Sequence, residues 1–295
     1  MILNVSGRTD IVAFYSEWFM NRYREGFVDV RNPFYYHMVS RIYFKDVDLI
    51  LFCTKNPLPI LDQLKEINKK ILFHVTLTPY KEDIEPKVLK KNIIEGIKRV
   101  SKIIGKDYVY VRYDPIFLND KYTVDYHIKA FDSMCSMLDG YVHHIIVSFL
   151  DEYKNVNKNK TILKNRMITE KEYRKIGFYF SSIAKRHRMC VQTCCEERNL
   201  VEYGFIKDDC ISRDLAYKLT KKKYKKWKVR DCQCVEMVDI GVYNSCGHFC
   251  KYCYANYDEK KVCAHFKKHN KNSSLLIGDL EEEDIIKVRA DNGKK

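Results

Sequence analysis

Short β-rich runs alternate with amphipathic, helix-like stretches along most of this chain, and that alternation most constrains its fold. The runs that predict strands are residues 2–6, 48–54, 71–78, 108–114, 144–150, 189–193 and 237–243. Apolar residues recur with helical spacing in residues 14–24, 86–104, 124–138, 170–187 and 215–226, and in a shorter stretch at 60–67. Strands that alternate with helices pair in parallel. We therefore predict an α/β fold, a TIM-like (β/α) barrel of about seven to eight units.

The domain boundaries follow from the same pattern. Residues 1–266 are expected to form the barrel, including a cysteine-rich loop at 246–253. Residues 267–295 are polar and charged and are expected to cap the barrel or to fray as a C-terminal tail. A dense basic run at 218–230 is expected to be a solvated face.

Polar residues gather where the predicted strands end, which is where (β/α) barrels place their chemistry. Arg8, Lys55 and Arg112 could bind an anionic group of a cofactor or substrate. Carboxylates at the same edge could bind hydroxyl groups or transfer protons. For every one of these side chains, an ion pair inside the barrel is the alternative. The cofactor-binding candidates at this edge are Ser6, Arg8, Asp10, Lys55, Arg112 and Asp114, with Glu196 as a further acid.

The cysteine content points to metal or redox chemistry. The chain has 12 cysteines, no apolar run near the ~20 residues of a membrane span, and no secretory segment at its start. We therefore expect a cytoplasmic protein without a membrane association and without a disulfide framework. The formal charge of +14 would attract nucleic acid or anionic substrates, although solubility alone can produce the same charge.

Cys246, Cys250 and Cys253 follow a predicted strand with C-x₃-C-x₂-C spacing. Three thiolates can bind three irons of a [4Fe–4S] cluster and leave the fourth iron without a protein ligand, as a catalytic metal requires. The alternative is zinc, with His248 or His265 as the fourth ligand.

The loop resembles the signature of radical S-adenosylmethionine (SAM) enzymes, in which an aromatic residue, here Tyr252, precedes the third cysteine. The resemblance implies that Tyr252 lies near the adenine of SAM and that the open iron binds its amino and carboxylate groups. In that superfamily the loop follows the first strand, whereas here it follows the last. We therefore predict a circularly permuted radical-SAM-type core, with strand 237–243 beside strand 2–6 and Ser6–Asp10 near the cofactor.

The chain as far as about Leu276 resembles a large bacterial family catalogued as a domain of unknown function, number 1848 (DUF1848). Two positions depart from the family pattern: Cys53 stands where Trp is common, and Val12 where Pro is common. A more distant similarity is to the spore photoproduct lyase branch of radical enzymes, which repairs DNA. The matching stretches are residues 6–10, 13–19, 31–33, 54–57, 76–80, 112–115 and 246–257.

A second set of cysteines also matches the family. Four thiolates from separate loops would close an auxiliary [4Fe–4S] or zinc site, and buried reduced thiols are the alternative. The set consists of Cys194, Cys210, Cys232 and Cys234. Of the others, Cys195 is ambiguous, and Cys53, Cys135, Cys190 and Cys263 are interpreted as core or incidental residues.

Together these features predict a radical SAM enzyme that removes hydrogen from an unidentified substrate, either a small molecule or a nucleic acid. A reductant such as flavodoxin or ferredoxin would supply the electron. The alternatives are a nucleic-acid-binding protein stabilised by zinc or an iron–sulfur cluster, and a redox sensor that does not cleave SAM.

Overall fold

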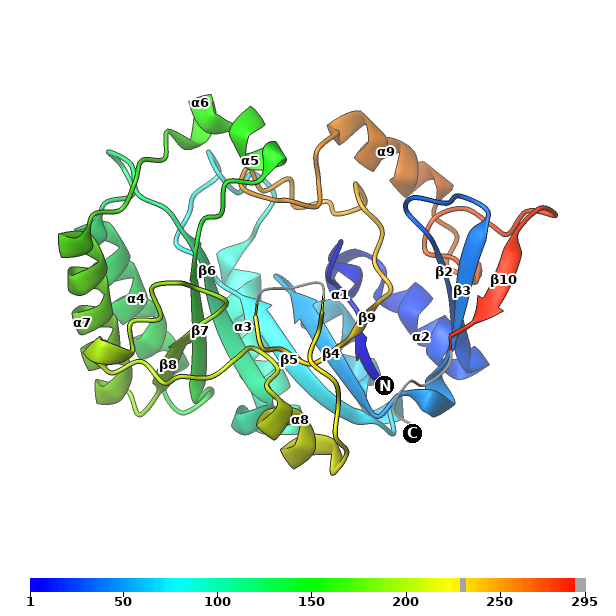
Figure 1. Ribbon diagram of the computed structural model, residues 1–295, viewed down its shortest axis with the longest axis horizontal. Coiled ribbons are helices and arrows are strands. Elements are labelled where there is room, and N and C mark those ends of the chain that lie inside the picture. Colours follow the sequence, from blue (N-terminus) through cyan, green and yellow to red (C-terminus); the bar gives the residue numbers. More distant parts are fainter. Residues whose placement is uncertain (229–231, 290–295) are drawn as a thin grey trace.

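The computed structural model describes residues 1–228 and 232–289, and its centre is a sheet whose strand pairings are all parallel (Figure 1). The order across this sheet is β8-β7-β6-β5-β4-β1-β9. The strands are β1 (Ile2–Asn4), β4 (Leu49–Thr54), β5 (Lys70–Thr76), β6 (Val109–Ile116), β7 (His144–Phe149), β8 (Cys190–Thr193) and β9 (Val238–Asp239). Each lies within or overlaps a run that the sequence predicts as a strand, so the α/β class is confirmed.

Most of the predicted helices are present, and their ends have local causes. The helices are α1 (Ile11–Phe14), α2 (Ser16–Glu25), α3 (Lys90–Ile104), α4 (Val124–Leu138), α7 (Glu170–Arg186) and α8 (Arg213–Thr220). The hydroxyl of Thr123 caps α4, and Thr169 forms a capping box with Glu172 at the start of α7. Helix α8 ends earlier than predicted, at Lys221 with φ 59°, where a run of lysines disfavours another turn. The end of that predicted basic run, residues 229–230, lies outside the described residues.

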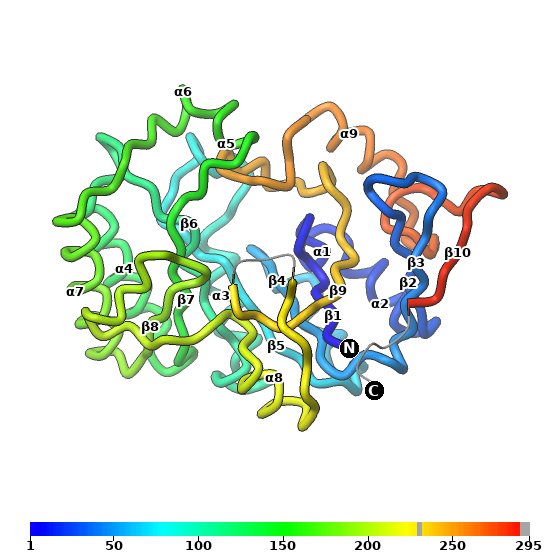
Figure 2. The backbone as a smooth tube through the Cα atoms, in the orientation of Figure 1, coloured from blue at the N-terminus to red at the C-terminus, as the bar shows by residue number. Residues whose placement is uncertain are grey.

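Strand β9 is near the end of the sequence but lies next to β1, the first strand (Figure 2). Leu3 pairs with Val238 and Asn4 with Asp239, both in parallel. Strand β9 therefore takes the first place in the sheet and the other six strands follow in sequence order. The predicted neighbourhood of the first and last strands is confirmed.

A closed barrel is not confirmed. Within the described residues, no pairing joins β8 to β9, so the sheet is open between them. After β8 the chain returns to make a single parallel bridge, Gln192 with Ile206, and then leaves for α8. Ile211, at the end of this returning segment, and Val235, which follows α8, both pack on one face of the sheet. The expected eighth unit is thus a covering segment rather than a paired strand.

The two faces of the sheet have different partners because side chains alternate along each strand. In β5 and β6, odd-numbered residues such as Phe73 and Val111 pack in a large apolar core, whereas even-numbered residues such as Leu72 and Tyr110 belong to a second cluster with Ile211. In β4 the numbering is reversed, and odd-numbered residues belong to the second cluster. Arg112 and Cys194 share the even-numbered alternation and so belong to this second, smaller face.

A second sheet, which the sequence analysis did not predict, lies beside the N-terminal helices. Strands β2 (Phe27–Arg31) and β3 (Met38–Tyr43) form a hairpin, and β10 (Ile285–Val288) pairs with β3 in parallel. The tail expected at 267–295 is therefore packed as far as residue 289, with a hydrogen bond of 2.8 Å from Trp18 Nε1 to Ser273 O. Residues 290–295 of that tail lie outside the described residues.

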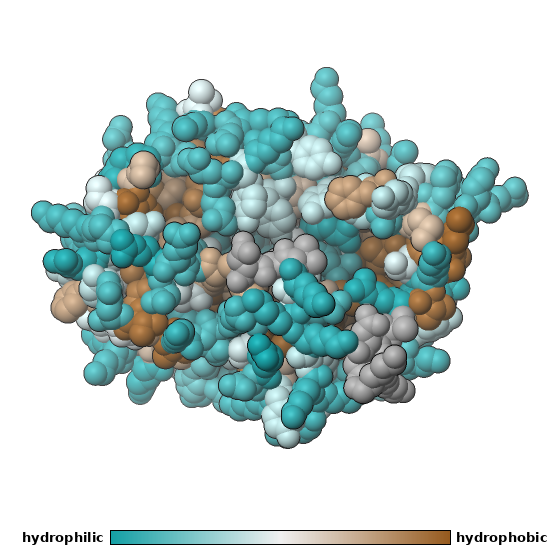
Figure 3. Space-filling model, in the orientation of Figure 1, coloured by the Kyte–Doolittle hydropathy of each residue, from teal (hydrophilic) through white to brown (hydrophobic). Residues whose placement is uncertain are grey.

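The surface is mostly hydrophilic, and its apolar side chains include those of β10, at the right-hand end of Figure 3. Three short helices lie near the cysteine loop at one end of the sheet: α5 (Lys154–Lys158), α6 (Lys160–Leu163) and α9 (Glu259–Lys268) (Figure 1). Within the described residues, no helix is long and apolar enough to cross a membrane.

Candidate metal centre

The loop after β9 is held closed by its own side chains. Asn256 donates a hydrogen bond of 2.6 Å to Cys246 O, and Asn244 Oδ1 accepts from Tyr257 N at 2.8 Å. A turn joins the other two cysteines, with Cys253 N donating to Cys250 O at 3.1 Å. These bonds bring the two ends of the loop together, so the three thiols form one group.

Each of the three thiols is affected by the charge of its neighbours. Burial raises the pKa of Cys246 well above its usual value, and Asp10 and the two other thiols raise it further. Burial also raises the pKa of Cys250, while the ammonium group of Lys55 opposes that rise. One buried thiol, Cys250, and two half-buried ones, Cys246 and Cys253, that disfavour one another's negative charge are a donor set suited to a cationic metal centre.

Three thiolates from one loop are ligands of the kind that a [4Fe–4S] cluster or a zinc ion takes. Within the described residues, no group of three or more His, Cys, Asp or Glu side chains is arranged to hold a metal ion. Of the two histidines considered as zinc ligands, His248 contacts Asp10 through Nε2 and His265 interacts with the backbone of Asn244. The buried Nδ1 atom of each has no hydrogen-bond partner among the described residues, so zinc stays an alternative.

Asp10 joins the N-terminal segment to this loop. One carboxylate oxygen accepts from Ala13 N at 3.0 Å and caps α1. The other accepts from Lys55 N at 2.7 Å and lies 3.0 Å from His248 Nε2. Asp10 is thus next to the cysteine loop, as the permutation hypothesis requires, and its contacts are those of a structural ion pair.

Arg8 and the glycine beside it fix the junction between β1 and β9. Arg8 Nη2 donates to Asp239 O at 3.2 Å, and its guanidinium lies 5.6 Å from the ring centre of Tyr243. A side chain at Gly7 would overlap the Asp239 carboxylate, so only glycine allows this approach. Ser6 is close by, where its hydroxyl accepts from Ile11 N at 3.2 Å.

Glu85 is the centre of a buried ion network that the sequence analysis missed. Its Oε1 lies 2.8 Å from Lys55 Nζ and accepts from the Thr78 hydroxyl at 2.7 Å, while Oε2 contacts Lys90. The hydroxyl of Tyr252 donates to the same carboxylate. Burial lowers the pKa of Lys55, and the Cys250 thiol and Asp114 oppose that effect. The only sequence signal for Glu85 was an acid between Ile84 and Pro86 in a loop that follows a predicted strand.

A family model described as "Domain of unknown function (DUF1848)" matches residues 2–255. The chain belongs to the DUF1848 family. The match includes β1 to β9 and all the cysteines of the loop, whereas α9 and β10 lie beyond it. A search of curated proteins found no match to the chain.

On the second face of the DUF1848 chain, Arg112 does not present a free charge to a ligand. Its Nε donates to Asp114 Oδ2 at 2.9 Å, and its Nη1 lies 3.3 Å from Cys210 Sγ. Nearby, Glu196 accepts from Phe149 N at 2.8 Å, and burial raises its pKa to about 7. Arg112 and Asp114, both predicted as cofactor-binding residues, therefore pair with each other beside the second cysteine set.

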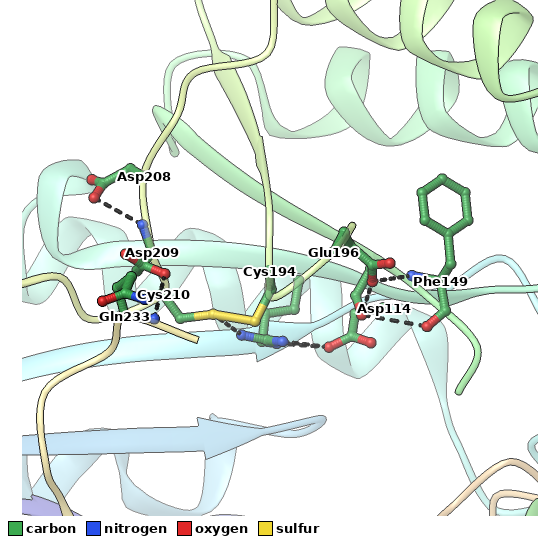
Figure 4. Close-up of a disulfide and its surroundings, with 10 residues drawn as sticks. Asp114, Phe149, Cys194, Glu196, Asp208, Asp209, Cys210 and Gln233 are labelled. Carbon is green, nitrogen blue, oxygen red and sulfur yellow. Dashed lines mark hydrogen bonds and ion pairs between the residues drawn. A yellow bond between two sulfur atoms is a disulfide. The ribbon is translucent and has the colours of Figure 1, made fainter. Parts of the chain in front are cut away.

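Figure 4 shows Cys194 and Cys210 of the DUF1848 chain joined in a disulfide, which the sequence analysis did not expect. The pairing arises because the chain returns alongside β8, which brings the two Cα atoms to 6.0 Å. Cys232 and Cys234 are buried in the same apolar cluster, and burial raises the pKa of Cys234 to about 12. All four predicted residues of the set are thus in one place.

The remaining cysteines have ordinary environments. Cys135 is buried in α4, and the Cys190 thiol lies 3.1 Å from His144 Nδ1. Cys195 and Cys263 are exposed, and Cys53 packs against the apolar cluster of the second set.

Proposed function

We propose that this protein is a radical SAM enzyme in which Cys246, Cys250 and Cys253 bind a [4Fe–4S] cluster. The observation that carries the proposal is the group of three thiols on one loop, buried at Cys250 and half-buried at the other two, which the contact of His248 with Asp10 holds against the segment after β1. With SAM bound, such a cluster supplies a 5′-deoxyadenosyl radical that abstracts hydrogen from the substrate. The protein's part is to bind, orient and shield these groups.

The charged neighbours of the loop have distinct tasks in this proposal. Lys55 favours the thiolate form of Cys250, which is the form that binds iron. Glu85 holds the Tyr252 hydroxyl and so fixes the ring beside Cys250, where the resemblance places the adenine. Asp10 and His248 keep the loop on the N-terminal segment. Ser6 and Arg8, on that segment, are then the residues nearest the amino-acid end of SAM.

The strand order supports the view that the core is a circular permutation of the radical SAM type. Placing β9 first gives the order β9, β1, β4, β5, β6, β7, β8, with the cysteine loop after the first strand of the sheet. The proposed reductant is flavodoxin or ferredoxin, which would place the reaction in the cytoplasm. Two substrate classes stay open. The distant similarity to spore photoproduct lyase and the charge of +14 favour a nucleic acid, and a small molecule is the other class.

The test is to purify the protein without oxygen, reconstitute it with iron and sulfide, and add dithionite and SAM. The proposal predicts about four irons per chain bound by this loop and release of 5′-deoxyadenosine. Colourless protein with bound zinc would favour the nucleic-acid-binding alternative. A full cluster that gives no 5′-deoxyadenosine would favour a redox sensor.

A further inference from the structure

We propose that Cys194, Cys210, Cys232 and Cys234 form a second, closed metal centre with four thiolate ligands. It would take a thiophilic metal, either one zinc ion or one [4Fe–4S] cluster. Since these ligands leave no position for a substrate, the centre would brace the fold or carry electrons. The inference does not depend on the proposed function, because the two sets share no ligand.

Three separate segments bring the four thiols together. Cys194 directly follows β8, where its backbone N–H donates to Val147 O at 3.0 Å. Cys210 comes from the returning segment, which is tied to the third segment by a bond of 3.1 Å from Gln233 N to Asp209 Oδ1 (Figure 4). Val235 N also donates to Ile211 O at 3.0 Å. These bonds connect the residues next to Cys210 with those next to Cys232 and Cys234.

The surroundings of the four thiols are mostly apolar, with the Arg112–Asp114 pair and Asp209 beside them. The cluster that contains the thiols includes Leu72, Ile146 and Ile211, whose side chains offer no hydrogen bonds. Arg112 enters the cluster with Nη1 at 3.3 Å from Cys210 Sγ. Arg112 also pairs with Asp114, and its positive charge would partly balance the net negative charge of a four-thiolate centre.

The Cys194–Cys210 disulfide is the oxidised alternative of the same arrangement. A dithiol reductant such as dithiothreitol transfers two electrons and two protons to the S–S bond and itself becomes a cyclic disulfide. The two thiols formed, together with Cys232 and Cys234, then lose their protons as they bind the metal. Metal binding and the disulfide are therefore mutually exclusive states.

The metal content of a variant without the first site tests the proposal. Cys246, Cys250 and Cys253 are all changed to Ala, and the full chain is purified anaerobically with dithiothreitol. We expect each chain to keep about one zinc or about four irons. Adding Cys232→Ala and Cys234→Ala should reduce that metal at least tenfold, whereas Cys135→Ala, a buried cysteine outside the set, should leave it unchanged. Metal-free protein with native circular dichroism, or metal that survives the two added substitutions, would overturn the proposal.

A titration with Co²⁺ provides a readout that does not require the added substitutions to fold. The variant without the first site is stripped of metal, reduced and titrated with Co²⁺ alone. We expect thiolate-to-cobalt charge-transfer absorption that saturates at one equivalent. No such absorption in folded protein would contradict a four-thiolate centre. Because this variant cannot bind the first cluster, the result is separate from success or failure of SAM cleavage.

Discussion

The two cysteine regions of this protein differ in how their thiols are brought together and in what surrounds them. In the first region, Cys246, Cys250 and Cys253 belong to one loop and lie near the ion network around Glu85. In the second region, the four cysteines come from three segments and lie in an apolar cluster with a single arginine. Three ligands leave an iron open for chemistry, whereas four close the site. The comparison separates a reactive centre from a structural or electron-carrying one.

The largest expected effect is on 5′-deoxyadenosine formation, when one thiol of the first region is removed. Cys250→Ala should lower 5′-deoxyadenosine formation to background, because two thiolates cannot hold the cluster with one open iron. The assay uses reconstituted protein with dithionite and SAM. Cys263→Ala, which changes an exposed cysteine in α9, is the matched control and should keep wild-type activity. Wild-type activity in the Cys250 variant would contradict the assignment of the reactive centre to the first region.

The first region should be sensitive to loss of charge. Glu85→Gln keeps the shape of the side chain but leaves the buried Lys55 and the half-buried Lys90 without the carboxylate that pairs with them. We expect a loss of about 3–5 kcal/mol in the free energy of unfolding, measured in urea. Glu82→Gln, at an exposed position on the same loop, should change it by less than about 0.5 kcal/mol. Equal effects of the two variants would contradict the network.

The second region should be sensitive to loss of apolar volume. Ile211 is fully buried in the cluster around the four cysteines. Ile211→Ala should therefore cost about 2–5 kcal/mol in the free energy of unfolding, as cavities in packed cores do. Ile206→Ala is the control, because Ile206 lies on the same returning segment but is exposed. A negligible effect of Ile211→Ala would mean that the segment does not pack on the sheet.

The junction that holds the first region against β1 should give a smaller effect. Gly7→Ala would push the new methyl group into the Asp239 carboxylate, and we expect a loss of about 1–3 kcal/mol in urea unfolding. In the double variant with Asp239→Ala the clash is gone, so the combined loss should be smaller than the sum of the single losses. Simple additivity would argue against the close approach of these two segments.

The smallest effect should come from a site outside both regions. Hydrogen bonding to Arg166 and to Thr169 lowers the pKa of Glu172 from 4.5 to about 2. Because the folded-state pKa is depressed, this stabilisation is present above the unfolded-state pKa and is lost as the pH falls from about 5 to 2. With the partial exposure of Arg166 taken into account, the loss is about 1 kcal/mol. Glu172→Gln should abolish this part of the pH dependence of the free energy of unfolding. If the difference in that free energy between pH 5 and pH 2 is the same in the variant and the wild type, the prediction is wrong.

Local sequence patterns were enough to predict the elements that depend on local rules. The strand runs and the stretches of α4 and α7 follow from β-rich composition and helical spacing, and the first cysteine group is visible as one spaced motif. The β1–β9 pairing could be predicted because radical SAM enzymes, which the loop resembles, carry the loop after the first strand of the sheet. A loop after the last strand fits that pattern only if the last strand lies beside the first.

The features that were missed depend on contacts between distant parts of the chain. Glu85 becomes important only because Lys55 and Tyr252 reach it from other loops. The second sheet requires β10 to cross to β3, a pairing of distant residues that no short motif encodes. Likewise, the sequence analysis grouped Cys194 with Cys210 but did not expect their disulfide, which depends on the returning segment that replaces a paired eighth strand.

The central claim is that the first cysteine region holds a cluster with one iron open to SAM. The most direct measurement is electron paramagnetic resonance of the dithionite-reduced Cys232→Ala/Cys234→Ala protein, recorded before and after addition of SAM. The account predicts a single reduced [4Fe–4S] signal that shifts when SAM binds the open iron. A signal with full iron content that SAM does not change, with no 5′-deoxyadenosine formed, would contradict it.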